Sequence, residues 1–218
     1  MRLPTCFWVA AALAASAVFQ IDTGRAQSRS PVLDRPPIPS IGDAFTYQYN
    51  TEIITYTYLG LRSGQSCYSA KIVKGIFSPT GGELTVCVPF GQDAVIASRQ
   101  VTSFSAYPGT LAFPLFIGKQ WQFSYHGKPR EMPDEFARSA EHVVEGEVTA
   151  YEPVTVPGGT FDAFKIEGYD SDWGNPDLKP FLAYYSPKVG FLKWDGYNMY
   201  GTHLELLRYL PVASARSQ

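Results

Sequence analysis

Apolar and polar residues alternate with a period of two over long stretches of the chain. The clearest stretch is 45–49 (FTYQY), and 54–58, 121–125 and 144–150 repeat the alternation with many β-branched and aromatic residues. Successive side chains of a strand point to opposite faces of a sheet, so this pattern predicts half-buried antiparallel strands. Less regular runs predict further strands at 66–77, 83–90, 92–101, 163–169, 181–186, 190–195 and 202–209.

The sequence predicts almost no helix. Segment 134–141 follows a proline, opens on an acidic pair and holds good helix formers, so a helix of about two turns there stands beside the alternative of a strand from residue 139. The predicted fold class is therefore all-β: a single curved antiparallel sheet or open half-barrel with at most a short helix. The motif I-G-x-x-F at 41–45 recurs as I-G-x-x-W at 117–121, which leaves two similar meanders as one option.

The N-terminus has the three parts of a secretory signal peptide. Arg2 gives a positive start, residues 6–19 are almost wholly apolar, and Gly24 and Ala26 are the small residues of a cleavage site. The apolar run has about 14 residues, fewer than the roughly 20 that a spanning helix needs; a retained anchor is the alternative. We expect cleavage near Ala26, a periplasmic or secreted product, and no transmembrane segment in the mature chain.

The remainder is expected to be one domain with two polar ends. After the signal peptide at 1–26, residues 27–40 carry four prolines and no periodicity, which predicts an extended lead. Residues 41–210 hold the predicted strands, and 211–218 form a polar tail of small residues. The full length of 218 residues fits one domain with its own core.

The chain has three cysteines, of which Cys6 lies in the predicted signal peptide. An oxidising compartment favours a disulfide between the other two, Cys67 and Cys87. Cys67 lies farther from the turn at 78–82 than Cys87 does, so a simple hairpin would not place them opposite each other. A bulge, a longer loop or pairing of non-adjacent strands is then required. A metal site on two thiols is the alternative, but no further ligand lies nearby in the sequence.

Motifs for catalysis or for a cofactor are absent from the sequence. It has no Gly-x-Ser-x-Gly elbow and no glycine-rich phosphate loop, and its three histidines are too far apart for a local metal scaffold. The acidic stretch 170–177 lacks the glycine and glutamate of a calcium loop and gives only weak metal candidates. These are Asp170, Asp172, Asn175 and Asp177. We expect no catalytic residue and no cofactor.

Composition narrows the classes of protein to which the chain can belong. Charged residues make up 17% of the chain and aromatic residues 15%, and the formal net charge is −2. This balance excludes a polybasic nucleic-acid binder and a disordered chain. The aromatic residues either fill a β core or line a groove for an apolar ligand. The candidates for a ligand contact are Phe116, Trp121, Phe123, Tyr184 and Trp194.

The C-terminal half carries a resemblance. Residues 152–166 (EPVTVPGGTFDAFKI) are similar to the E-x-V-T-V-P-A-G-T-F-x-A-x-K-I signature of exported bacterial proteins of uncharacterised function. Residues 184–190 resemble their W-Y-x-P-x-V-G segment, 205–209 their closing E-L-x-x-Y and 114–121 their P-L-x-x-G-x-x-W opener. The resemblance implies a relation to curved half-barrels of the lipoprotein-carrier (LolA/LolB-like) type, whose concave aromatic face holds an acyl chain. It transfers no catalytic residue.

Three functional hypotheses follow. The first is an exported non-enzymatic β protein that binds a lipidic or other apolar ligand in an aromatic-lined groove. The second is an envelope structural or protein-interaction module that uses a sheet edge or an aromatic patch to hold an envelope protein. The third is a hydrolase with a dispersed active site, which the missing motifs make the least favoured of the three.

Overall fold

The structure is a computed structural model that describes residues 31–75, 82–89, 111–127, 140–171, 178–196 and 202–212. These residues form ten β-strands and no helix, so the predicted all-β class is confirmed. The strand predicted at 92–101 lies outside the described residues. So does the helix predicted at 134–141, apart from its last two residues, which begin a strand. No helix in the described ranges is long and apolar enough to cross a membrane.

All ten strands belong to one antiparallel sheet in the order β4-β3-β2-β1-β10-β9-β8-β7-β6-β5. Their bounds are β1 Ala44–Tyr49, β2 Glu52–Arg62, β3 Gln65–Lys74, β4 Glu83–Pro89, β5 Gln120–Gly127, β6 Ala140–Val156, β7 Gly159–Ser171, β8 Leu178–Ser186, β9 Gly190–Gly196 and β10 Thr202–Leu210. The chain makes two meanders, β1 to β4 and β5 to β10, and the pairing of β1 with β10 joins them. The sheet is open, and β4 and β5 are its edges.

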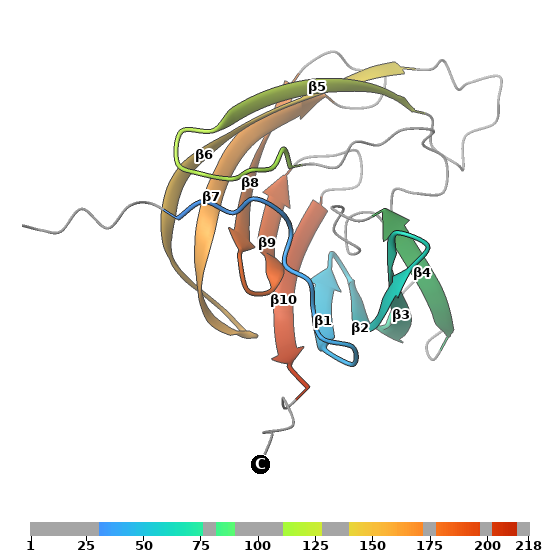
Figure 1. The fold of residues 1–218 in the computed structure, drawn as a ribbon. Helices are drawn as coiled ribbons and strands as arrows, with labels where there is room; N and C mark the ends of the chain where they lie inside the picture. The colour runs from blue at the N-terminus through green and yellow to red at the C-terminus, as the bar shows by residue number, and fades with distance from the viewer. Residues whose placement is uncertain are drawn as a thin grey trace, which may run out of the picture.

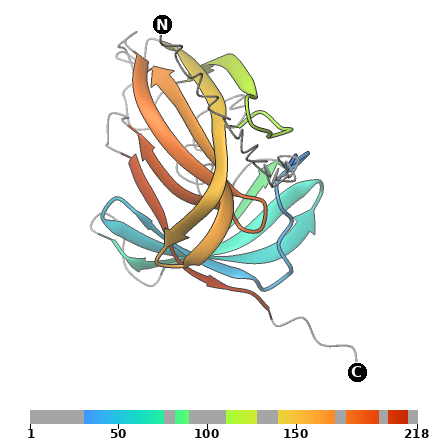
Figure 2. The same ribbon diagram turned by 90° about the vertical axis from the view of Figure 1, so that its left-hand side faces the viewer.

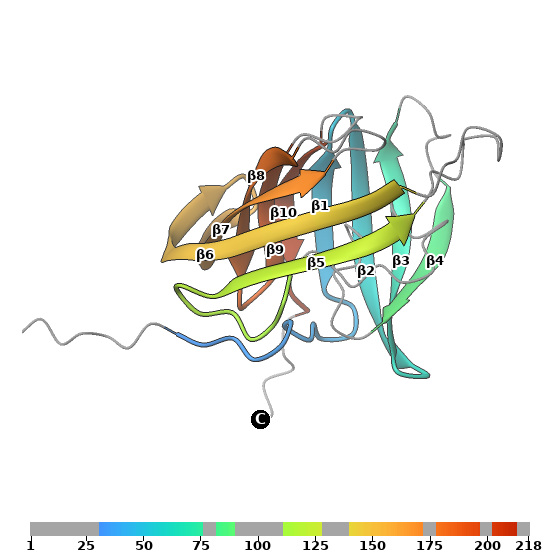
Figure 3. The same cartoon turned by 90° about the horizontal axis from the view of Figure 1, so that it is seen from above.

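The sheet curls so that its two ends lie on opposite sides of a shared core. In Figure 1, β5 to β7 arch over the top of the molecule while β1 to β4 stand below them. Figure 3 shows from above that β5 and β6 run across β1 to β4 at a steep angle, and Figure 2 shows β6 and β7 bending around one side. Buried side chains from both ends, such as Tyr56 of β2 and Val148 of β6, belong to one hydrophobic cluster.

Strand alternation decides which face enters this core. On β2, Ile54, Tyr56 and Tyr58 are buried, and the residues between them are only half-buried. Neighbouring rings pack together across strands, with a centroid separation of 5.1 Å between Tyr58 and Tyr68. Each large apolar side chain that is fully buried contributes about 1.5–3 kcal/mol to folding. Phe164 is 0% exposed, so its ring is part of the core.

The predicted disulfide between Cys67 and Cys87 is present and joins the neighbouring strands β3 and β4. The two cysteines are register partners, and so are Lys71 and Glu83 nearer the turn. The cysteines thus lie directly opposite each other on adjacent strands, which excludes pairing of non-adjacent strands. Residues 76–81 of the connection lie outside the described residues.

Asp43 links the residues that lead into β1 with those that follow β10, the last strand. The carboxylate belongs to a residue that is 5% exposed, and it accepts hydrogen bonds from the backbone N–H groups of Ser40 (2.9 Å) and Val212 (2.7 Å). The Tyr209 hydroxyl donates a third hydrogen bond to it. Burial, followed by the charge and the hydrogen bond of Asp43, raises the pKa of Tyr209. The two ends of the described domain are therefore held at one buried carboxylate.

Besides Ser40, the proline-rich lead contacts the domain through Leu33. Leu33 and Leu115 exchange two backbone hydrogen bonds of 2.9 Å as an isolated antiparallel bridge. The side chain of Leu115 is 0% exposed, and that of Leu33 packs against the core. This bridge places the lead beside the segment that enters β5.

Candidate functional site

A row of rings and glycines crosses the inner face of β5 to β9. Trp121 of β5 is the register partner of Gly146, Gly146 that of Gly168, Gly168 that of Phe181, and Phe181 that of Gly196. A Cβ on Gly146 would lie 2.5 Å from the indole Cε2 of Trp121, and a Cβ on Gly168 would lie 2.5 Å from the ring of Phe181. Because Gly146 and Gly168 have no side chain, the rings of Trp121 and Phe181 can occupy that space.

One ring of this row, that of Phe181 on β8, stacks on an aromatic residue of β9. Phe181 lies parallel to Trp194, with ring centroids 4.3 Å apart and an interplanar angle of 16°. Phe181 is 5% and Trp194 8% exposed. Trp121 is half-buried, and its buried indole Nε1 has no hydrogen-bond partner among the described residues. The sheet at this point is thus backed by a layer of close-packed rings.

The outward face of the same strands carries a second row, shifted by one residue. Its members are Gln120, Glu147, Glu167, Leu182 and Asp195, each the register partner of the next. Because neighbouring residues of a strand point to opposite faces, this row faces away from the core. Glu147 and Glu167, two carboxylates of like charge, are therefore direct cross-strand neighbours.

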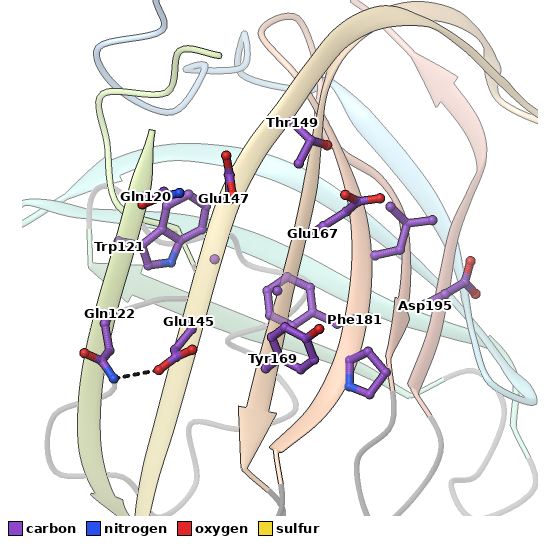
Figure 4. Close-up of a pocket in the computed structure, with 14 residues that line it drawn as sticks. Gln120, Trp121, Gln122, Glu145, Glu147, Thr149, Glu167, Tyr169, Phe181 and Asp195 are labelled. Carbon is purple, nitrogen blue, oxygen red and sulfur yellow. Dashed lines mark hydrogen bonds between the residues drawn. The ribbon is translucent and has the colours of Figure 1, made fainter. Parts of the chain in front are cut away.

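A hollow of about 1020 Å³ lies over these strands and is open to solvent. Most of its lining side chains belong to the outward face, and the rest come from the ring-and-glycine row beneath. From β5 to β9 the lining residues are Gln120, Trp121, Gln122, Glu145, Gly146, Glu147, Thr149, Glu167, Gly168, Tyr169, Pro180, Phe181, Leu182 and Asp195. Figure 4 shows these side chains, with β1 to β4 behind the strands that carry them. The hollow combines a carboxylate-rich rim with aromatic and apolar groups.

Two glutamates of β6 form the acidic side of the hollow. Gln122 of β5 donates a hydrogen bond from Nε2 to Oε1 of Glu145 at 2.7 Å, drawn as a dashed line in Figure 4. Glu147 lies between Gln120 and Glu167 in the register. Among the described residues no cationic group lies within ion-pair distance of Glu145 or Glu147. Like charges that face each other across strands repel, so this side of the hollow favours a bound cation.

The next strand, β7, carries a charge-balanced pair. Lys165 Nζ lies 2.7 Å from Glu167 Oε1. The hydrogen bond from Lys165 lowers the pKa of Glu167, and the same bond raises the pKa of Lys165. Because both groups face solvent, the pair adds little to stability and acts mainly to neutralise Glu167.

Asp195 of β9 has one cationic neighbour, Lys193, and a hydrogen-bonded histidine, His203. Lys193 Nζ lies 2.9 Å from Oδ2, and His203 Nδ1 of β10 lies 2.6 Å from Oδ1. Partial burial raises the pKa of Asp195, but the hydrogen bonds and charges of His203 and Lys193 outweigh that effect, so its pKa lies below its ordinary value. The β9 side of the hollow is therefore balanced in charge, whereas the β6 side is not.

This arrangement is suited to non-covalent recognition of a cation. Exposed carboxylates accept hydrogen bonds and attract positive charge, and the nearby rings offer apolar surface to the rest of a ligand. No group of three or more His, Cys, Asp or Glu side chains in the described ranges is placed to hold a metal ion. Asp170 is the register partner of Lys179, and the other weak metal candidates, Asp172, Asn175 and Asp177, lie outside the described residues.

The predicted ligand contacts are dispersed. Trp121 lines the hollow, and Trp194 lies beneath it as part of the ring layer. Tyr184 lies half-buried on β8, on the outward face by alternation, but outside the lining. Phe116, 38% exposed, precedes β5, and Phe123 is described by its backbone alone.

Sequence reasoning missed the carboxylates of the hollow. Their signal is visible as acidic residues at alternate positions of 143–149 and as the K-I-E run at 165–167. Alternation shows which residues of one strand share a face. The same pattern is found on a strand face that is simply exposed to solvent. The pairing of β6 with β7, and of β8 with β9, brings these residues into one row, and that pairing depends on contacts far apart in the chain.

The described residues form an all-β protein with one open antiparallel sheet and a carboxylate-rich hollow on its outward face. No protein-family model matches the chain, and no curated protein matches it. Similar solved structures include one described as an exported protein with a YmcC-like fold from Bacteroides fragilis, at 15% identity, covering 83% of this chain and 100% of that one, with a TM-score of 0.42.

Two further structures are similar to the same degree. One, described as a lipoprotein from Parabacteroides distasonis, has 14% identity, covers 84% of this chain and 100% of that one, and has a TM-score of 0.40. The other, the hypothetical lipoprotein YmcC from Escherichia coli, has 11% identity, covers 82% and 92% of the two chains, and has a TM-score of 0.40. Likeness of this degree carries no functional assignment to this chain.

Proposed function

We propose that the chain is an exported, non-enzymatic interaction module that binds a basic segment of another envelope protein in the hollow over β5 to β9. Export is supported by the signal-peptide pattern of residues 1–26. The observation that carries the proposal is the uneven charge of the hollow: Glu145 and Glu147 have no cationic partner among the described residues, whereas Glu167 and Asp195 each have one.

The remaining lining suits the stems of lysine and arginine side chains. Tyr169 is 49% exposed on the outward face, and Pro180 is its register partner on β8. A cation above an aromatic ring gains about 0.5–1 kcal/mol at an exposed site, and the aliphatic stem buries apolar area at the same time. The apolar lining of the hollow can therefore carry the stem of a basic side chain whose charge lies beside Glu145 and Glu147.

A second candidate is a carrier of a lipidic or other apolar ligand, to which the resemblance of residues 152–166 points. One structural observation favours it: Leu84 of β4 is the register partner of the buried Ala70, and so shares the inner face, yet it is 50% exposed. The ligand would then contact the β3–β4 end of the inner face. The buried rings of Phe181 and Trp194 would remain core.

The test uses a peptide of about ten residues that alternates lysine and valine, with a glutamate-for-lysine peptide as its control. We expect the lysine peptide to bind, with an affinity that falls as salt is added. The double variant E145Q/E147Q should weaken binding about tenfold, because each lost surface charge interaction is worth several tenths of a kcal/mol to about 1 kcal/mol. The matched control is E152Q, which removes an exposed carboxylate of β6 outside the hollow.

Two outcomes would contradict the proposal. Equal binding of both peptides, or an equal effect of E152Q and E145Q/E147Q, would show that the hollow is not the acidic site. Incubation with phospholipid followed by native mass spectrometry tests the second candidate. A retained lipid together with no lysine-peptide binding would favour the carrier.

A further inference from the structure

We propose that the partner docks along the edge of β5 as an additional antiparallel strand, with its basic side chains on the outward face of the sheet. This inference rests on the proposed function, because it names the mode in which the basic segment binds. It is argued from the backbone groups of β5, from the composition of its edge and from the distance to the unpaired glutamates.

The hydrogen bonds before β5 fix which of its backbone groups face the open side. Val148 of β6 accepts from Gly118 N at 2.8 Å and donates to Lys119 O at 2.9 Å, so the backbone of Val148 points toward β5. Hydrogen-bonded pairs alternate along an antiparallel ladder, so Trp121 pairs in the same way with Gly146. The residues between the bonded ones, Gln120, Gln122 and Ser124, therefore direct their N–H and C=O groups to the free edge.

The edge of β5 lacks the features that commonly prevent pairing. Its eight residues, QWQFSYHG, contain no proline, lysine, aspartate or glutamate. The opposite edge, β4, is one residue shorter, begins with Glu83, ends with Pro89 and is crosslinked through Cys87. Exposed edges are usually protected by charge, by proline or by covering segments. In the described part of the chain, β5 is thus the edge with the chemistry of a docking strand.

Glu145 and Glu147, which have no cationic partner among the described residues, favour a basic segment at this edge. Gln120 and Gln122 expose their side chains on the outward face, and Glu147 and Glu145 are their register partners one strand further in. Strands lie about 4.8 Å apart, so an added strand would lie about two spacings from β6. Lysine or arginine stems can span that distance across the glutamines. A second copy of this chain would bring another Gln120 and Gln122 to the edge and would leave the glutamates without a cation.

The experiment uses the lysine–valine peptide in two N-methylated forms. Residues of the added strand that direct N–H groups at Gln120, Gln122 and Ser124 are those with side chains on the outward face, which are the lysines. Methylating the lysine amides should therefore weaken binding at least about tenfold, whereas methylating the valine amides should change it little. Both peptides keep the same charge and the same number of methyl groups, so each controls for the other, and no protein variant has to fold.

Hydrogen exchange of the full chain gives the second readout. Peptide binding should slow the backbone amides of Gln120, Gln122 and Ser124 and leave that of Trp121, already bonded to β6, nearly unchanged. If both methylated peptides bind equally while E145Q/E147Q still weakens binding, the edge inference is overturned and the proposed function stands. If the unmethylated peptide does not bind, the proposed function fails. Protection of the three edge amides without peptide, in a dimer, would assign the edge to a second copy and overturn the inference.

Discussion

The indole of Trp121 lies where any side chain at position 146 would stand. Trp121 belongs to the edge strand β5, and its neighbour Gly146 belongs to β6. The edge strand is thus anchored to the sheet by a ring laid on a glycine, in addition to its ladder of hydrogen bonds. The same ring lines the outward hollow, so the packing of the core and the shape of the hollow depend on one contact.

Replacing Gly146 with alanine should displace this ring. The new Cβ would overlap the indole, and overpacking of this kind costs about 1–3 kcal/mol. Urea unfolding measures the loss, and a change in tryptophan emission reports the movement of the indole. The double variant W121A/G146A removes the obstructing ring, so its cost should be smaller than the sum of the two single costs. Strictly additive costs would contradict the contact.

The Cys67–Cys87 disulfide should be a major source of stability for the β4 edge. It closes a sequence separation of 20 residues, for which loop closure predicts about 3 kcal/mol. The variant C67A/C87A should lower the free energy of unfolding by about 2–4 kcal/mol in urea. Reductant should destabilise the native chain and have no effect on the variant. An effect of reductant on the variant would mean that it acts elsewhere.

The strands were predictable because their signal is local. Residues 54–58 and 144–150 show their period of two within a few positions, and the structure places them in β2 and β6. The pairing of β1 with β10 could not be predicted, because it joins the first strand to the last one and no short motif specifies it.

The candidate site was harder to predict for a related reason. An aromatic residue at every second position fits a filled core as well as an open groove, and the curl of the sheet decides between them. Trp194 is therefore in the ring layer, whereas the half-buried Trp121 reaches the hollow. The sequence analysis did not single out the carboxylates, because their meeting in one row depends on the register of five strands.

Removing the carboxylate of Asp43 should loosen both ends of the domain. Three donors would lose their acceptor, and hydrogen bonds to a charged group contribute about 1.5–3 kcal/mol each, although not additively. We expect D43A to lower the free energy of unfolding by at least about 2 kcal/mol and to speed hydrogen exchange at the Val212 amide. The exposed Asp34 provides the control D34A, which should be nearly neutral. Equal losses in the two variants would contradict the role of Asp43.

Stability should depend on pH through Asp195. Its pKa is lowered in the folded chain, since the hydrogen bonds and charges of His203 and Lys193 outweigh the opposing effect of partial burial. A carboxyl whose folded pKa is depressed stabilises the fold above its unfolded pKa of about 3.9, and that contribution is lost as pH falls through the folded value. D195N should therefore be less stable than the native chain near neutral pH, and the difference should shrink below about pH 4.

The size of this difference is limited because Asp195 is partly exposed, with 41% of its side-chain surface accessible. Solvent screening reduces the contribution of such pairs to a few tenths of a kcal/mol or about 1 kcal/mol at most. Urea unfolding of both proteins at several values between about pH 7 and about pH 3 measures it, and E152Q controls for the change in net charge. A difference that stays constant over this range would mean that Asp195 stabilises the sheet by packing, and that the ion pairs with Lys193 and His203 contribute nothing.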